Sequence, residues 1–92
     1  MISRDRAKQI RRIARAHGVV RLRIFGSHAV RAAAASSDLD LLVDLKPERD
    51  LLDLIAFKLD LEEVLGCKAD VVTERGLSPY LRARILRVAK PL

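Results

Sequence analysis

The sequence contains few aromatic residues, a single cysteine and no long apolar run. Aromatic side chains make up 3% of its 92 residues and tryptophan is absent, so aliphatic side chains must build the core and platforms for stacking bases are scarce. The one cysteine, Cys67, cannot form an internal disulfide and is expected to be a small buried side chain. No stretch approaches the roughly eighteen apolar residues of a membrane span, and the N-terminus lacks the apolar segment of a signal peptide. We therefore expect a cytoplasmic protein that does not enter a membrane.

Length and charge set further bounds on function. With 50% apolar residues, the chain 1–92 can form one small domain with one core, without room for a separate substrate-binding domain. Lys and Arg number 18 against 12 Asp and Glu, a formal charge of +6. This excess favours polyanionic partners such as nucleotides, RNA or an acidic protein. An ordinary solvated basic surface explains it equally well.

Hydrophobic periodicity predicts helices that alternate with strands. Ser3 can cap a first helix, and Gly18 can stop it. Val20, Leu22 and Ile24 then alternate with arginines, which predicts a strand buried on one side. Alternating helices and strands imply a small α/β sandwich, although strand order and direction stay open. We expect helices at about 3–17, 29–35, 50–65 and 79–89, and strands at about 20–25, 38–45 and 68–73.

Two of the predicted helices carry apolar stripes. The stripe of the last helix, on Leu81, Ile85 and Val88, serves either as a core contact or as a docking surface for a partner. The stripe of the 50–65 helix should cover one face of the sheet. It consists of Leu51, Leu54, Ile55, Lys58, Leu59 and Leu61.

Three aspartates are candidates for metal binding. Asp38 and Asp40 should project from the same face of a strand, about 6.6 Å apart. If the strand that carries Asp70 is adjacent, at about 4.8 Å, the three carboxylates could hold two magnesium ions for displacement at phosphorus. The alternative is structural, with Asp38 ending a loop, Asp40 on an exposed face and Asp70 an ordinary edge charge. Asp44 lies about 13 Å beyond Asp40 and is interpreted as structural.

The turn Gly26-Ser27 is a candidate phosphate site. Glycine permits close backbone approach, while the serine hydroxyl and free N–H groups at a helix start suit phosphate. Taken alone, the pair is better explained as a turn with a helix cap. Together with the aspartates that follow, the turn places a phosphate-binding site and metal ligands at the same end of two strands.

The pattern of Gly26 and Ser27, ten residues, then Asp38 and Asp40 resembles the signature of the minimal nucleotidyltransferase (MNT) family, in the DNA polymerase beta-like superfamily. The resemblance continues through the segments 41–44, 50–65, 68–72 and 77–81. It implies a nucleotidyltransferase-like sandwich in which about four helices flank a mixed three-stranded sheet.

The resemblance also implies residue roles and a reaction. Gly26 and Ser27 would hold the donor phosphates, Asp38 and Asp40 would bind both magnesium ions, and Asp70 would be the third catalytic and metal-binding carboxylate, preparing the acceptor hydroxyl. The implied reaction transfers AMP from ATP and releases pyrophosphate.

Small members of the MNT family are commonly antitoxins paired with HEPN-domain ribonuclease toxins. The resemblance therefore implies adenylylation of a toxin tyrosine in a heteromeric complex. Many relatives have Arg followed by Gly where this chain has Val30-Arg31, so a non-catalytic antitoxin that occludes its toxin is the alternative. Transfer to a small molecule is disfavoured because no acceptor domain is present. Direct nucleic-acid binding is not expected, because no recognised binding motif is present.

Overall fold

Helix α1 (Arg4–Ala16) begins where the sequence predicts, because the Ser3 hydroxyl accepts a hydrogen bond from the backbone N–H of Arg6 at 3.2 Å. The inward side of α1 carries Ile10 and Ala14, both buried, in agreement with the predicted periodicity. The computed structural model describes residues 3–26 and 38–92. The helix predicted at 29–35 therefore lies outside the described residues.

The strands form one mixed sheet in the order β3-β2-β1-β4. Strand β1 (Val19–Phe25) runs antiparallel to both β2 (Leu39–Leu45) and β4 (Lys90–Pro91), whereas β2 and β3 (Ala69–Val72) are parallel. The predicted α/β class and mixed sheet are confirmed. The prediction of three strands misses β4, because two residues that include a proline show no readable alternation.

One prediction for β1 is wrong at its first residues. The pairing with β2 shifts between Val19 and Arg21, so Val20 is 60% exposed while Val19 is buried. A bulge adds one residue to a strand and exchanges its two faces, which simple alternation does not anticipate. Beyond the bulge, Leu22 and Ile24 contact the core as predicted.

Helix α2 (Leu51–Leu65) starts and stops as expected, with Asp50 as its N-cap and Gly66 as its left-handed C-cap. The predicted core stripe is wrong in part, because the helix is apolar on both sides. Leu51, Ile55 and Leu59 are exposed, as is Leu52 at 74%. The side that packs on the sheet consists of Leu54, Phe57, Leu61 and Leu65.

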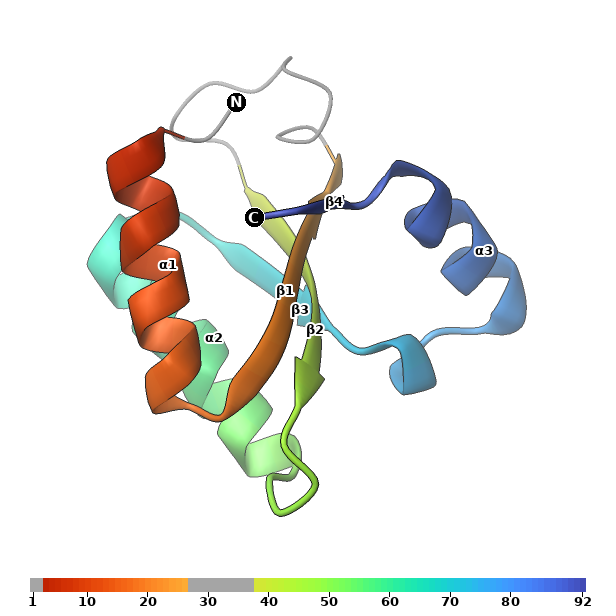
Figure 1. Cartoon of the computed structure of the whole chain (residues 1–92), viewed down its shortest axis with the longest axis horizontal. Helices are drawn as coiled ribbons and strands as arrows, with labels where there is room; N and C mark the ends of the chain where they lie inside the picture. Colours follow the sequence, from red (N-terminus) through yellow and green to blue (C-terminus); the bar gives the residue numbers. More distant parts are fainter. Residues whose placement is uncertain (1–2, 27–37) are drawn as a thin grey trace.

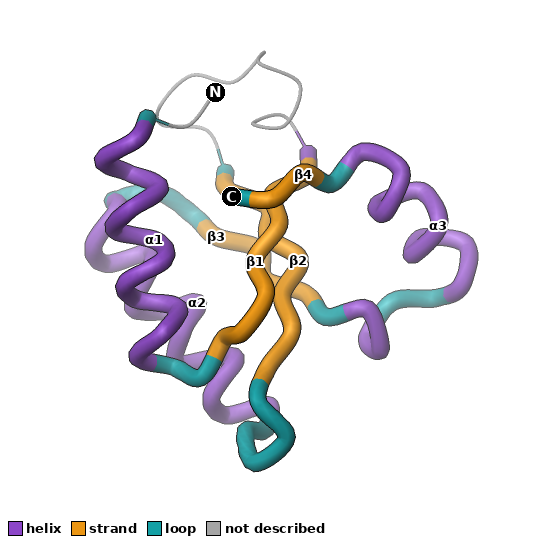
Figure 2. Tube along the Cα trace, in the orientation of Figure 1, coloured by secondary structure: helices purple, strands orange, loops and turns teal. Residues whose placement is uncertain are grey.

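The two faces of the sheet are covered differently (Figure 1, Figure 2). Helices α1 and α2 lie together on one side of the strands, where the inward residues of β2, Leu39, Leu41 and Val43, join the buried core. The third helix, α3 (Pro79–Val88), stands on the opposite side and has no buried residue. The described parts of the chain contain these three α-helices and a short 3-10 helix, η2 (Glu74–Gly76).

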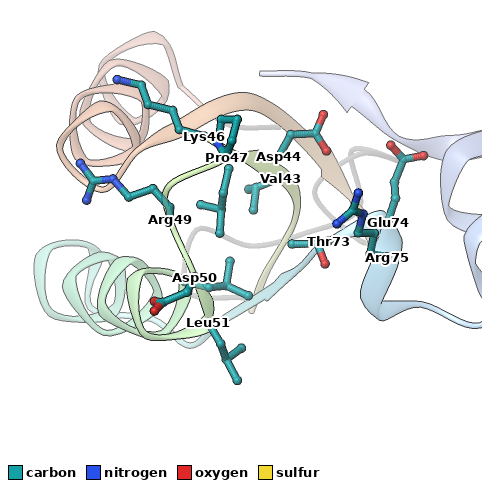
Figure 3. A pocket seen from close by; sticks show the side chains of 12 residues that line it. Val43, Asp44, Lys46, Pro47, Arg49, Asp50, Leu51, Thr73, Glu74 and Arg75 are labelled. Carbon is teal, nitrogen blue, oxygen red and sulfur yellow. The ribbon is translucent and has the colours of Figure 1, made fainter.

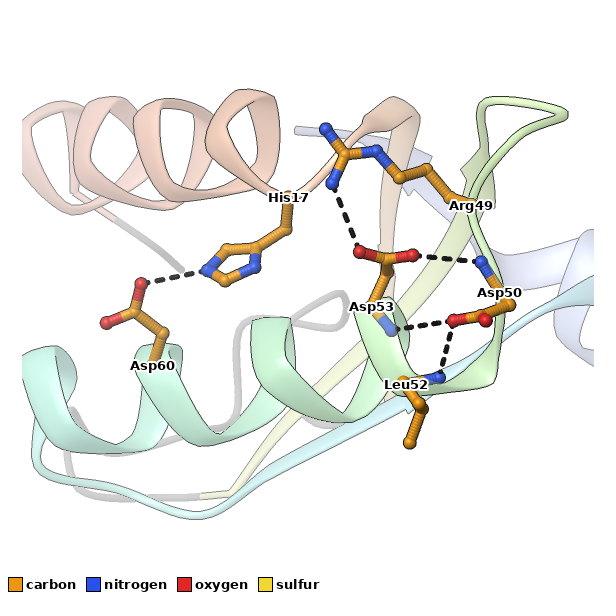
Figure 4. A network of polar contacts seen from close by, with 6 residues as sticks. All are labelled: His17, Arg49, Asp50, Leu52, Asp53 and Asp60. Carbon is orange, nitrogen blue, oxygen red and sulfur yellow. Dashed lines mark hydrogen bonds and ion pairs between the residues drawn. The ribbon is translucent and has the colours of Figure 1, made fainter.

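Polar contacts join α1 to α2 (Figure 4). His17, which ends α1, lies with its Nε2 3.0 Å from the Oδ2 of Asp60 on α2. This contact ties the end of α1 to the side of α2. Cys67 is half-buried rather than buried, and its sulfur accepts a hydrogen bond from Arg6 at 3.5 Å.

Arg23 is a buried charge on the face of the sheet opposite α1 and α2. Only 7% of it is exposed, and its guanidinium lies 3.3 Å from Glu74 and 4.0 Å from Asp44. The structural interpretation of Asp44 agrees with this ion pair. The alternation of β1 predicts that Arg23 lies on the solvent side of a half-buried strand. Arg23 is buried instead, because η2 covers the end of the sheet, a long-range contact that alternation does not reveal.

No helix in the described segments combines the length and apolar character needed to cross a membrane.

Candidate active site

The sheet brings Asp40 and Asp70 together. Asp40 on β2 is in register with Asp70 on β3 and with Phe25 on β1. Register partners in neighbouring strands share a face, so the two carboxylates project side by side from the face opposite α1 and α2. Asp40 is half-buried and Asp70 is exposed. The sequence left strand order open, and the structure meets the condition that the strand of Asp70 is next to that of Asp40.

Gly26 follows β1 and lies directly against the carboxylate of Asp40. Its φ is +74°, a left-handed conformation that favours glycine. A Cβ added at this position would collide with Oδ2 of Asp40. Both the backbone conformation and the neighbouring carboxylate therefore require glycine here. Ser27, its predicted partner in phosphate binding, lies outside the described residues, as do Val30 and Arg31.

Asp38 precedes β2 by one residue and is exposed. Carboxylate oxygens are the ligands that magnesium prefers, and a cation would offset the repulsion between two in-register carboxylates. Asp40 and Asp70 thus fit a metal chemically. Within residues 3–26 and 38–92, however, no group of three His, Cys, Asp or Glu side chains is placed to hold an ion. The complete three-aspartate set therefore stays a prediction.

A cavity that the sequence did not reveal opens beside Gly26. It measures about 450 Å³ and lies between the end of β1 and helix α3. The sequence signal is the apolar stripe of Leu81, Ile85 and Val88, which predicts a core contact or a docking surface but not a cavity. The lining residues are Phe25, Gly26, Leu81, Arg84, Ile85, Arg87 and Val88.

A larger cavity, of about 690 Å³, lies at the far end of β2 from Asp40 (Figure 3). Much of its charge already takes part in ion pairs within the fold. Asp44 and Glu74 pair with Arg23, and Arg49 pairs with Asp53. The adjacent N-terminus of α2 is satisfied by its own cap. Size alone therefore does not identify the active site, and the aspartate pair beside Gly26 is the better candidate.

Comparison with known proteins assigns the class. The family described as the nucleotidyltransferase domain matches residues 7–90, so the chain belongs to this family. Its fold is also similar to a solved structure described as a candidate minimal nucleotidyltransferase. That structure is 48% identical, with a TM-score of 0.83 over 97% of this chain and 91% of the other. The resemblance seen in the sequence is thereby confirmed.

Two curated archaeal relatives carry more particular names. MJ0435 of Methanocaldococcus jannaschii, a candidate protein adenylyltransferase, is 47% identical over 73 residues, which are 79% of this chain and 78% of the relative. Protein adenylyltransferase MntA of Thermococcus cleftensis is 34% identical over 70 residues, 76% of this chain and 71% of the relative.

The fold is also shared with a more distant solved complex. It joins a tri-AMPylated Shewanella oneidensis HEPN toxin to an MNT antitoxin. The matched chain is 18% identical, with a TM-score of 0.75 over 98% of this chain and 71% of the other. At this identity the match concerns the fold alone.

Proposed function

We propose that this chain is the antitoxin of a HEPN/MNT toxin–antitoxin pair and transfers AMP from ATP to a tyrosine of its toxin. The observation that supports this most strongly is the register that places Asp40 beside Asp70 and against Gly26. The names of the two archaeal relatives describe transfer of AMP to protein, and the toxin in the Shewanella complex carries AMP. Because the donor is ATP, the cytoplasm is the expected compartment.

In the proposed reaction, the phenol oxygen of the toxin tyrosine attacks the α-phosphorus of ATP. A bond forms between that oxygen and phosphorus. The bond from the α-phosphorus to its bridging oxygen breaks, and pyrophosphate leaves with the electron pair. Asp70, the more exposed of the paired carboxylates, accepts the phenol proton, while Gly26 and Ser27 hold the donor phosphates.

Asp38, Asp40 and Asp70 are the proposed ligands of two magnesium ions. When bound, magnesium neutralises charge on the phosphate oxygens and orients the reacting groups. Asp40 is central to this set, because it is in register with Asp70 and lies two positions from Asp38. Its carboxylate therefore has to be ionised and held in place, and contact with the Gly26 backbone restricts where it can move.

Replacing Asp40 with Asn tests both the chemistry and the metal site. We expect Asp40→Asn to reduce AMP transfer to the HEPN-domain partner by about a thousandfold or more, because a neutral amide neither binds magnesium as strongly nor balances its charge. Intact-mass spectrometry of the partner measures transfer, and titration calorimetry measures magnesium binding in the presence of ATP.

The matched control is Asp44→Asn, the same change on the same strand and face, four residues from Asp40. It removes one carboxylate facing Arg23 and should leave transfer and magnesium binding close to wild type. An unmodified partner in a confirmed complex with the wild-type chain, ATP and magnesium would contradict the proposed reaction. If neutralisation of the toxin also survives Asp38→Asn and Asp40→Asn, the chain acts by occlusion instead.

A further inference from the structure

The cavity between β1 and α3 shares a wall with the candidate active site. Phe25, which lines the cavity, is the register partner of Asp40. Gly26, the next lining residue, lies against the Asp40 carboxylate. A molecule seated in the cavity is therefore separated from the catalytic carboxylate only by the end of β1.

The lining of this cavity has two chemical parts. Phe25 and the aliphatic side chains of α3 supply apolar walls, and Arg84 and Arg87 supply positive charge. The Arg84 guanidinium stacks over the ring of Tyr80, 5.7 Å from its centroid, which restricts its position. Apolar walls beside guanidinium groups suit a ligand that joins a flat base to anionic phosphate. The volume, about 450 Å³, is within the usual range for small-molecule sites.

Strand order separates this cavity from the acceptor side of the site. In the order β3-β2-β1-β4, Asp70 lies on one side of Asp40 and the cavity lies on the other. A donor nucleoside bound beside β1 thus leaves the β3 side, with Asp70, open to the acceptor hydroxyl. Two substrates can approach Asp40 without competing for the same surface.

We propose that the cavity holds the nucleoside of the donor nucleotide, with its base against Phe25 and the apolar side of α3. Arg84 and Arg87 face the charged end of the same ligand. This inference rests on the proposed function and extends it, because it assigns the nucleoside subsite to α3. It also gives α3, which has no buried residue in the described structure, a ligand against which its apolar side packs.

Filling the cavity without altering the catalytic carboxylates tests the proposal. Val88 lines the cavity and is 43% exposed, so Val88→Trp adds bulk there without overpacking the core. Leu86→Trp is the matched control, since Leu86 is on the same helix, is 39% exposed and does not line the cavity. Titration calorimetry with magnesium measures the affinity for ATP and, separately, for inorganic tripolyphosphate.

We expect Val88→Trp to weaken ATP binding by about tenfold or more, because the indole would occupy the space of the nucleoside. The affinity for tripolyphosphate, which has no nucleoside, should stay within about twofold. Leu86→Trp should change neither affinity. Circular dichroism checks that each variant is folded. Val88→Phe adds less bulk than Val88→Trp, and it should likewise weaken the binding of ATP more than that of tripolyphosphate.

Two results would overturn the inference alone: unchanged ATP binding in Val88→Trp, or equal losses for ATP and tripolyphosphate, which would place phosphates in the cavity. Absence of ATP binding by the wild-type chain would instead reject the proposed function, and the nucleoside subsite with it. A cavity that serves only to dock the toxin would appear as lost partner binding with unchanged ATP affinity.

Discussion

At the scale of single residues, glycine matters most where the candidate site is tightest. Gly26 and Gly66 both adopt left-handed backbone angles, with φ of +74° and +68°. Their surroundings differ, since a Cβ at Gly66 meets nothing within 4 Å whereas one at Gly26 meets the Asp40 carboxylate. Alanine substitutions at these two glycines therefore separate the free-energy cost of the backbone conformation from the cost of disturbing the candidate site.

We expect Gly66→Ala to cost about 1 to 2 kcal/mol of unfolding free energy, the usual penalty for a left-handed alanine. Gly26→Ala should cost more and should also weaken magnesium-dependent ATP binding, because Asp40 must move aside. Urea denaturation measures stability, and calorimetry measures binding. Equal effects of the two substitutions on ATP affinity would show that Gly26 does not position Asp40.

At the scale of elements, the start of α2 is held by a reciprocal cap (Figure 4). The Asp50 carboxylate accepts hydrogen bonds from the backbone N–H groups of Leu52 and Asp53, and the Asp53 carboxylate accepts one from the backbone N–H of Asp50. Arg49 also donates to Asp53, at 3.1 Å. The Asp50 backbone bond first, and Arg49 second, lower the pKa of Asp53 below its ordinary value of 3.8.

This cap predicts a specific acid sensitivity. A lowered folded-state pKa means that Asp53 contributes stability above pH 3.8, and that this contribution is lost as the pH falls through the lowered value. Asp53→Asn should therefore lose less stability than wild type between pH 5 and about pH 2, as followed by urea midpoints at each pH. Glu63→Gln controls for the loss of one negative charge on the same helix. Parallel pH profiles for Asp53→Asn and wild type would show that the cap does not titrate.

At the scale of the whole molecule, the two faces of the sheet have different roles. One face is sealed by α1 and α2 over fully buried side chains such as Ile10, Phe57 and Leu61. The other carries the aspartates and is bordered by α3, which has no buried residue (Figure 1). A stable layer on one face thus supports a polar, accessible face on the other.

Hydrogen exchange should reveal this asymmetry. Because α3 has no buried residue, its amides should exchange through local opening, faster than those of α2. Added ATP and magnesium should slow exchange in α3 and leave α2 nearly unchanged, if the nucleoside lies against α3. Exchange in α3 as slow as that in α2 without ligand would contradict the expected local opening.

Much of the fold and part of the site could be predicted from the sequence. The cap at Ser3 and the ends of the helix predicted at 50–65 both follow from interactions within a few residues. Helical and strand periodicities are local geometry, so a single sequence expresses them directly. The motif of Gly26 with Asp38 and Asp40 likewise identified the correct family.

Other features depended on contacts between distant parts of the chain. The parallel pairing of β2 with β3 placed Asp70 beside Asp40, and the bulge near Val20 reset the faces of β1. Both sides of α2 are apolar, so only packing on the sheet selected Phe57 and Leu61 for the core. The cavity beside Gly26 likewise exists only because α3 returns to the end of β1. Local patterns specify which faces can be buried, whereas the choice among them depends on which partners the folded chain brings together.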